Sequence, residues 1–81
     1  MKATLDFDLN DPDDRMDHER CVKAEDMAIV IWEFAHNSKK TLEYEMDKNP
    51  NFTPYDAIDA VFAHFWELLN DQNINIDKLI R

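Results

Sequence analysis

The longest apolar run in the chain covers residues 27–35, where Glu33 is the only polar side chain. Charged residues surround this run, a pattern typical of the middle of a helix that is buried over part of its circumference. Asp11 followed by Pro12 indicates a helix start, because aspartate caps free amide groups and proline fits the first turn. The pattern therefore predicts a helix over residues 12–45. It allows a break near 37–38, where Asn and Ser are poor helix formers.

A narrow seam of small and apolar residues follows this helix at intervals of three and four, and Ser38 is its only interruption. Residues at such intervals share one face of a helix, and small side chains let a second helix approach closely. We therefore expect the seam to be the packing face of the first helix. Its members are Cys21, Ala24, Ala28, Ile31, Ala35 and Leu42.

A second helix is predicted over residues 54–72. Pro50 prevents the first helix from continuing, Thr53 supplies a cap, and Pro54 takes the first helical position. Two helices joined by so short a loop predict an antiparallel hairpin. The apolar positions of the second helix form one broad stripe, made up of Ile58, Val61, Phe62, Phe65, Leu68 and Leu69.

The two ends of the chain have patterns of their own. Residues 2–9 alternate apolar and polar side chains, which is the period of a half-buried strand. Three arrangements of this β-like extended segment stay open: pairing with residues 74–77, pairing with its own copy in a second subunit, and packing as an arm without a sheet. In the tail, residues 73–81, we expect Ile74 and Ile76 to cover the open end of the hairpin. Residues 77–80 suit a short turn.

Composition narrows the fold class to a mainly α single domain over residues 1–81. The chain has no glycine, so the positive-φ turns that many-stranded sheets need are scarce. The first helix is apolar around so much of its circumference that one neighbouring helix cannot cover it. We therefore expect a homodimer in which two hairpins form a helical bundle. The expected interface comprises Met27, Ile29, Val30, Ile31, Trp32 and Phe34.

The charge balance is strongly acidic: 18 acidic against 9 basic residues give a net charge of −9. Such a chain repels a phosphate backbone, which argues against direct binding of nucleic acid. It suits a basic groove on a protein partner, and solubility is the alternative explanation. The candidate acidic interaction surface comprises Asp11, Asp13, Asp14, Asp17, Glu19, Glu43, Glu45, Asp47, Asp56, Asp59 and Glu67.

Few residues indicate catalysis or metal binding. Glu33 and His36 share one helix face, as do His64 and Glu67, and Glu-x-x-His is half of a di-iron carboxylate site. Both glutamates lie off the apolar stripes, so we expect these residues at the surface and keep a metal site only as an alternative. No zinc-site spacing and no glycine-rich phosphate loop is present. We expect no enzymatic activity and no cofactor.

The sequence also carries signals of compartment. Cys21 is the single cysteine, which excludes an internal disulfide and suits a reducing environment. The N-terminus lacks the apolar core of a signal peptide, and no apolar run approaches the ~20 residues of a membrane span. We therefore expect a cytoplasmic protein that has no membrane partner.

Four short segments carry a resemblance: Met1-Lys-Ala-Thr-Leu-Asp-Phe7, Cys21-Val-Lys-Ala24, Ala28-Ile-Val-Ile-Trp-Glu-Phe34 and Ile74-Asn-Ile-Asp77. Together they resemble a family of small uncharacterised proteins encoded by tailed bacteriophages, which open with Met-Lys-Ala-x-Leu-x-Phe and carry a Leu-Trp-Glu or Leu-Trp-Asp element. Here Asn10-Asp-Pro12 stands in place of the family's Leu-Pro, and Ile31 in place of its leucine. The resemblance implies a phage protein in the cytoplasm of a bacterial host. It transfers no functional residue, because the family has no assigned chemistry.

Two functions from different classes stay open. The first is a small acidic phage accessory protein that acts by binding a host or phage protein. One form of this hypothesis is inhibition of a host nucleic-acid-handling or defence protein, whose basic surface it would occupy as a nucleic-acid mimic. The second is a structural or scaffolding oligomer, whose function is the assembly formed by its own apolar helix.

Overall fold

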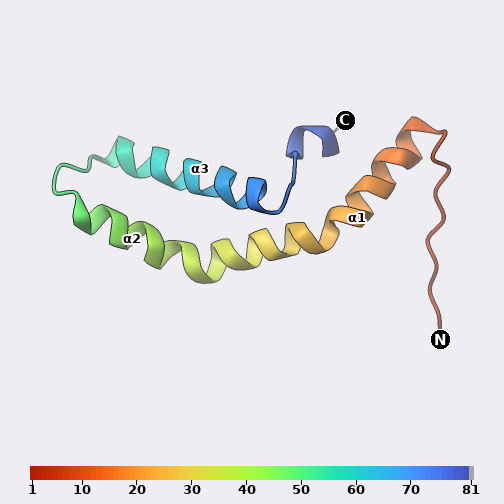
Figure 1. Ribbon diagram of the computed structural model, residues 1–81, viewed down its shortest axis with the longest axis horizontal. Helices are drawn as coiled ribbons and strands as arrows, with labels where there is room; N and C mark the ends of the chain where they lie inside the picture. Colours follow the sequence, from red (N-terminus) through yellow and green to blue (C-terminus); the bar gives the residue numbers. More distant parts are fainter. Residues whose placement is uncertain (81) are drawn as a thin grey trace.

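The computed structural model describes residues 1–80 and shows a mainly helical protein, as predicted. Figure 1 shows one long, curved helical run from which the chain turns back, so that a second long helix lies antiparallel beside the first run. The two longest helices contact each other directly. The elements in chain order are α1 (Pro12–Glu33), the π-helical turn η1 (Phe34–Ser38), α2 (Lys39–Lys48), α3 (Pro54–Asp71) and the 3₁₀ turn η2 (Ile76–Leu79).

The start of α1 follows the predicted capping chemistry. The Asp11 side chain accepts a hydrogen bond from the amide of Asp13 at 3.0 Å, and Pro12 takes the first position. Asp14 adds a second tie, since its carboxylate accepts from the amide of Asp8 at 3.1 Å. The Asp11 bond satisfies an amide that a helix start leaves unpaired, and the Asp14 bond ties the preceding segment to the first turn. The prediction of this boundary is therefore confirmed.

The predicted break near 37–38 is a π-helical turn rather than an interruption. Residues 34–38 form η1, and the backbone stays in the right-handed helical region through Ser38 and Lys39. Ser38 Oγ donates to the carbonyl of Glu33, five residues earlier, at 3.4 Å. A π turn holds more residues than an α turn, so every residue beyond it is rotated relative to α1. The helical run then continues to Lys48, three residues beyond the predicted end.

The start of α3 is the predicted one and contains a complete capping box. Thr53 Oγ1 accepts from the amide of Asp56 at 3.1 Å, and the Asp56 carboxylate accepts from the amide of Thr53 at 3.0 Å. Two otherwise unpaired amides are therefore satisfied reciprocally. The helix ends at Asp71, one residue before the predicted end, with Gln72 as its C-cap.

Asn73 turns the chain at the end of α3. Its φ of 55° lies in the left-handed region, which asparagine tolerates better than most residues in a chain that has no glycine. The amide of Ile74 bonds to the carbonyl of Leu69 at 2.9 Å, and that of Asn73 to the carbonyl of Asn70 at 3.0 Å. This is the Schellman arrangement, and its usual apolar contact is supplied by Ile74 beside Leu69.

The tail then covers the open end of the hairpin, as predicted. Ile74 is buried and Ile76 is half-buried, and η2 supplies the expected short turn. Leu79 also enters the core, and Arg20 Nε donates to its carbonyl at 2.7 Å. The tail is therefore fastened to α1 by a side chain that lies 59 residues away in sequence.

The main core lies where the tail, α3 and α1 meet, and it is built from Val30, Leu69, Ile74 and Leu79. This position corrects the predicted packing face of the first helix. Val30 lies well around the helix from the seam, yet it is the buried residue of α1. The π turn explains the error in part, because it rotates Ser38 and Leu42 onto the side of Val30. Apart from buried Leu42, the seam residues are exposed: Cys21, Ala24, Ala28, Ile31 and Ala35.

No strand occurs within residues 1–80, so the segment at 2–9 does not pair with 74–77 of the same chain. Residues 1–8 have no regular secondary structure and run away from the helices (Figure 1). Only Phe7 in this segment is half-buried, with its ring 5.4 Å from that of His18 in an edge-on arrangement. Pairing with a second subunit stays a prediction.

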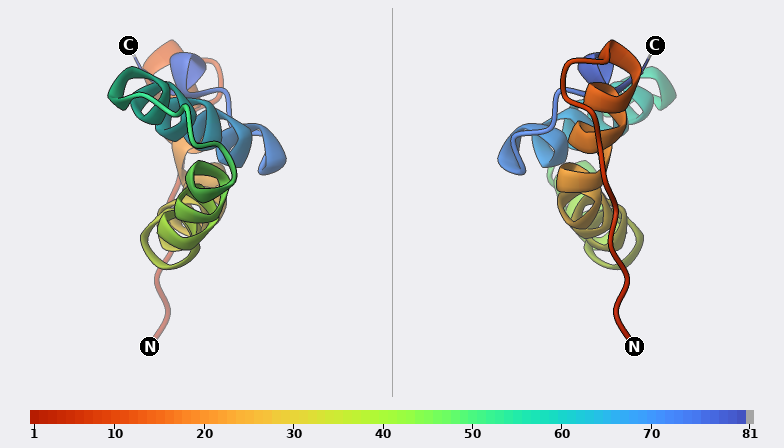
Figure 2. Two further views of the ribbon diagram at one scale, coloured as in Figure 1. Left: turned by 90° about the vertical axis from the view of Figure 1, so that its left-hand side faces the viewer. Right: turned by 90° about the vertical axis from the view of Figure 1, so that its right-hand side faces the viewer.

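The hairpin is a single layer of helices. Its Cα atoms extend over 54 × 30 × 16 Å, and the end-on views of Figure 2 show no further element on either face. The radius of gyration is 17.4 Å, whereas a compact chain of this length has about 12 Å. No side chain within residues 1–80 is completely buried. Because domains normally enclose a core between two layers, this fold leaves apolar surface uncovered.

Candidate functional site

The four residues of the alternative metal site do not form one. Glu33 accepts a hydrogen bond from the Asn37 amide group at 2.8 Å, and the His36 ring lies 4.7 Å from that of Trp32. His64 is engaged with Ser38, and Glu67 lies exposed on α3. Within residues 1–80, no three histidine, cysteine or acidic side chains are grouped so that they could hold a metal ion.

Ser38 and His64 form the one polar contact that joins η1 to α3 within the described chain. Ser38 Oγ lies 2.6 Å from His64 Nε2, and Ser38 is only 3% exposed. A serine nucleophile must be reachable and its histidine must be oriented by a third group. Ser38 is covered, and no carboxylate within residues 1–80 hydrogen-bonds His64. The pair therefore links the two arms of the hairpin and explains why a serine interrupts an otherwise apolar seam.

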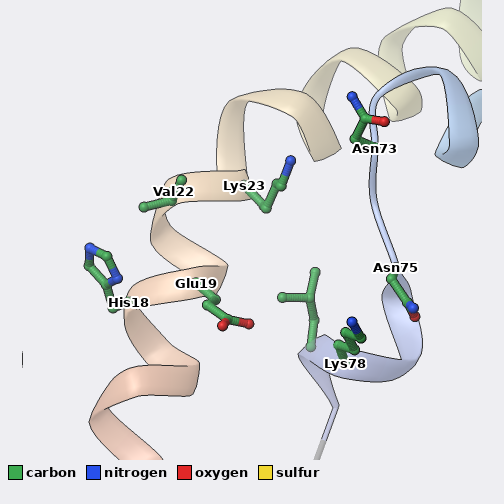
Figure 3. A pocket seen from close by; sticks show the side chains of 8 residues that line it. His18, Glu19, Val22, Lys23, Asn73, Asn75 and Lys78 are labelled. Carbon is green, nitrogen blue, oxygen red and sulfur yellow. The ribbon is translucent and has the colours of Figure 1, made fainter. Parts of the chain in front are cut away.

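A hollow of about 450 Å³, lined mostly by residues with polar or charged side chains, lies between α1 and the tail (Figure 3). In Figure 3 Glu19 and Lys23 lie on the side of α1 that faces η2, whereas His18 and Val22 point away from it. Lys23 is held by Asp26 at 3.6 Å. Ligand sites usually bury polar groups that converge on one point. Here the lining is open and its charges are mixed, so the hollow lacks the features of a small-molecule site.

The predicted acidic surface divides into two sets. One set has structural partners: Asp11 and Asp56 take part in helix caps, Asp14 accepts from the amide of Asp8, Glu43 pairs with Lys39 at 3.8 Å, and Asp13 and Asp17 also have interactions within the chain. The other set is exposed, and no hydrogen bond or ion pair engages it within residues 1–80. It consists of Glu19, Glu45, Asp47, Asp59 and Glu67, and we refer to it as the exposed acidic set.

The exposed acidic set extends over α1, α2 and α3 instead of gathering in one pocket. Such a distribution suits contact with a broad charged surface. It offers no focused catalytic charge, because a catalytic carboxylate works within hydrogen-bond reach of a reacting group.

The residues predicted to form an oligomer interface are also divided. Val30 is buried and Met27 is half-buried against the core of the hairpin, so neither offers free surface. The other four are exposed: Ile29, Ile31, Trp32 and Phe34.

The second helix contributes exposed apolar residues, and two of them, Ile58 and Phe62, belong to the stripe that the sequence pattern assigned to the interior. Ile58, Phe62 and Trp66 follow one another at intervals of four, so they share a face of α3. Phe62, Val61, Phe65 and Phe34 line one apolar hollow of about 330 Å³. The rings of Phe34 and Phe65 meet edge-on at 5.8 Å. We call the exposed residues on this side the apolar flank: Ile31, Phe34, Ile58, Phe62 and Trp66.

One signal for this flank was present in the sequence. The apolar stripe of the second helix is broader than the contact that one neighbouring helix provides. A stripe of that width requires a further neighbour to bury it, as does the apolar surface around the first helix.

Within residues 1–80, no helix is both long and apolar enough to cross a membrane. Comparison with known proteins gives no assignment: no family model, no curated protein and no solved structure matches the chain.

Proposed function

We propose that the protein is a non-enzymatic interaction factor that binds a basic surface on another protein through its exposed carboxylates. In line with the phage resemblance, the partner is a host protein of the bacterial cytoplasm that handles nucleic acid or takes part in defence. The exposed acidic set would occupy the surface on which that protein receives phosphates.

The observation that carries this proposal is the uncompensated charge of the helical surface. A net charge of −9 is large for 81 residues, and no ion pair within residues 1–80 engages the five carboxylates of the exposed acidic set. Carboxylates carried on rigid helices lose little conformational freedom on binding, and complementary charge speeds association. Such a surface favours a basic partner and disfavours an acidic one.

The test is affinity capture from bacterial lysate with the tagged protein, analysed by mass spectrometry at low and raised salt. We expect one dominant basic partner that is lost at raised salt, because exposed charges are screened beyond about 10 Å at 0.1 M ionic strength. A partner retained unchanged at raised salt would contradict the charge mechanism.

A variant that reverses four charges sharpens the test: Glu45→Lys, Asp47→Lys, Asp59→Lys and Glu67→Lys. None of these side chains has a structural partner within the described residues, so the helices should remain intact by circular dichroism. The matched control replaces the same residues by Gln or Asn, which removes charge without inverting it. We expect partial loss of capture for the control and complete loss for the reversal. Full capture by both variants would refute the proposal.

A second candidate is the self-assembling structural oligomer. It is favoured by a different observation, namely that the hairpin has no completely buried side chain within residues 1–80 and leaves an apolar flank exposed. A stable assembly formed by the purified protein without any partner would distinguish this candidate from the interaction factor.

A further inference from the structure

We propose that the apolar flank pairs with the same flank of a second copy of the chain, giving a two-fold arrangement of four long helical arms. This pairing differs from the one predicted from the first helix alone, because α3 supplies three of the five flank residues. Of the exposed acidic set, Asp59 lies beside the flank on α3, whereas Glu19, Glu45 and Asp47 lie on α1 and α2.

The chain exposes more surface than a compact monomer of its mass. The accessible surface is 6815 Å², whereas a compact monomer of 9.6 kDa exposes about 5,100 Å². The excess is therefore about 1,700 Å², part of it on the irregular N-terminal segment. A stable interface buries about 800 Å² on each partner. One copy thus has enough surplus surface for a dimer of standard size.

The missing second layer identifies the occupant as another copy. The hairpin is one layer of helices, and its flank is apolar along much of α3 and around η1. A second hairpin placed on this flank supplies the absent layer and encloses the exposed side chains between four arms. Two-fold pairing also places the same patch on both sides of the contact, which is the commonest form of oligomer interface.

The two arms of the hairpin differ in the size of their exposed apolar side chains. Large side chains, Phe62 and Trp66, project from α3, while small ones continue from Ile31 along α1. Ala28 and Ala35 lie three residues before and four residues after Ile31, so they share its face, and both are exposed. Small residues let a facing helix approach closely. In a two-fold pair, the aromatic side chains of each copy would cover the alanines of the other.

Charge does not prevent this pairing, although each copy carries −9. No position of the flank, nor Ala28 or Ala35 beside it, is charged. The nearest carboxylate is that of Asp59, which lies seven residues before Trp66 and so shares its side of α3. It would lie at the rim of the contact, where water and salt screen it. Raised salt should leave the dimer intact or strengthen it, the opposite of its effect on binding to a basic partner.

The test is the molar mass of the full chain by light scattering and sedimentation, from about 1 µM to about 1 mM. We expect twice 9.6 kDa for the wild type. Phe62→Glu places a charge at the centre of the contact and should raise the dissociation constant at least about 100-fold. Tyr44→Glu is the matched control, since Tyr44 is equally exposed but lies on α2 outside the flank. It should dimerise like the wild type.

A second variant keeps the test decisive if Phe62→Glu fails to fold. Ala28→Arg adds a large charged side chain to an exposed position of α1 and reduces the net negative charge. Weaker pairing could then not come from greater repulsion between the two acidic copies, and would reflect obstruction of the contact or burial of the arginine within it. We expect a helical monomer. A single-chain mass for the wild type at about 1 mM would overturn the inference, as would unchanged pairing of both variants. A monomer would leave the acidic function standing, and loss of partner capture would leave the pairing standing.

Discussion

The two halves of α3 carry the same apolar stripe but differ in what covers it. Leu69 and Phe62 are seven residues apart and therefore lie on the same side of the helix. Leu69 is 3% exposed, whereas Phe62 is 62% exposed. Near Leu69 the tail crosses the helix with Ile74 and Leu79, and near Phe62 no segment of residues 1–80 does so.

This difference shows that burial along the stripe depends on a third element rather than on composition. The contact with α1 covers only one side of α3, and the tail completes the cover over one end. Burying a Phe or Leu side chain fully contributes about 1.5–3 kcal/mol. In a single chain, Leu69 makes this contribution because it is buried, and Phe62 does not because it is exposed. A second copy that covered Phe62 would therefore be stabilised by burying it.

The largest effect is expected at the covered half. Leu69→Ala leaves a cavity among Val30, Ile74 and Leu79, and should lower the free energy of unfolding by about 2–5 kcal/mol. Phe62→Ala in dilute protein should cost less than about 1 kcal/mol, because most of that side chain is already in water. Urea unfolding followed by circular dichroism, at one low protein concentration, compares the two. Equal losses would break the distinction between the halves.

The next effect is expected at the polar link between the arms. Ser38→Ala removes the partner of His64 Nε2 and should cost about 1–3 kcal/mol. The double variant Ser38→Ala with His64→Leu replaces both polar groups, so it should recover most of that loss. Thermal unfolding of the two single variants and the double variant forms the cycle that measures the link. A double variant as unstable as the sum of the single ones would show that the two residues are not coupled.

A smaller effect is expected at the cap of the uncovered half. Thr53→Ala removes one bond of the capping box and should cost about 1 kcal/mol, with frayed amides at the start of α3. Thr53→Ser keeps the hydroxyl and serves as the control. Hydrogen exchange of the amides of residues 54–58 reports the fraying. Unchanged exchange in Thr53→Ala would mean that the cap does not limit the stability of this half.

The smallest effect is expected at the turn into the tail. Asn73→Ala puts a less tolerant residue at φ 55° and should cost about 0.5–1 kcal/mol. Asn73→Gly should be neutral to within about 0.5 kcal/mol, because glycine adopts this conformation freely. Denaturant midpoints separate the two. A larger loss for Gly than for Ala would indicate that the asparagine side chain, rather than its backbone conformation, stabilises the covered end.

The sequence by itself determined the helical class and the starts of both long helices, because these depend on interactions within a few residues. Asp11 with Pro12 and Thr53 with Asp56 act locally, and the structure reproduces both caps. The sequence also predicted that Ile74 covers the open end of the hairpin, because Ile74 is apolar. The Leu79–Arg20 tie was not, since its partners lie 59 residues apart.

Only the tertiary structure decided which face of α1 packs inward. Helical phase accumulates along the chain, and the π turn at 34–38 shifts it between Val30 and Leu42. A prediction that assumes a constant helical period along the chain therefore places the seam in the interior. In the structure, packing against α3 and the tail buries Val30 instead. Local chemistry sets where helices begin, but the face that is buried is chosen by partners distant in sequence, and this choice left the seam and the apolar flank exposed.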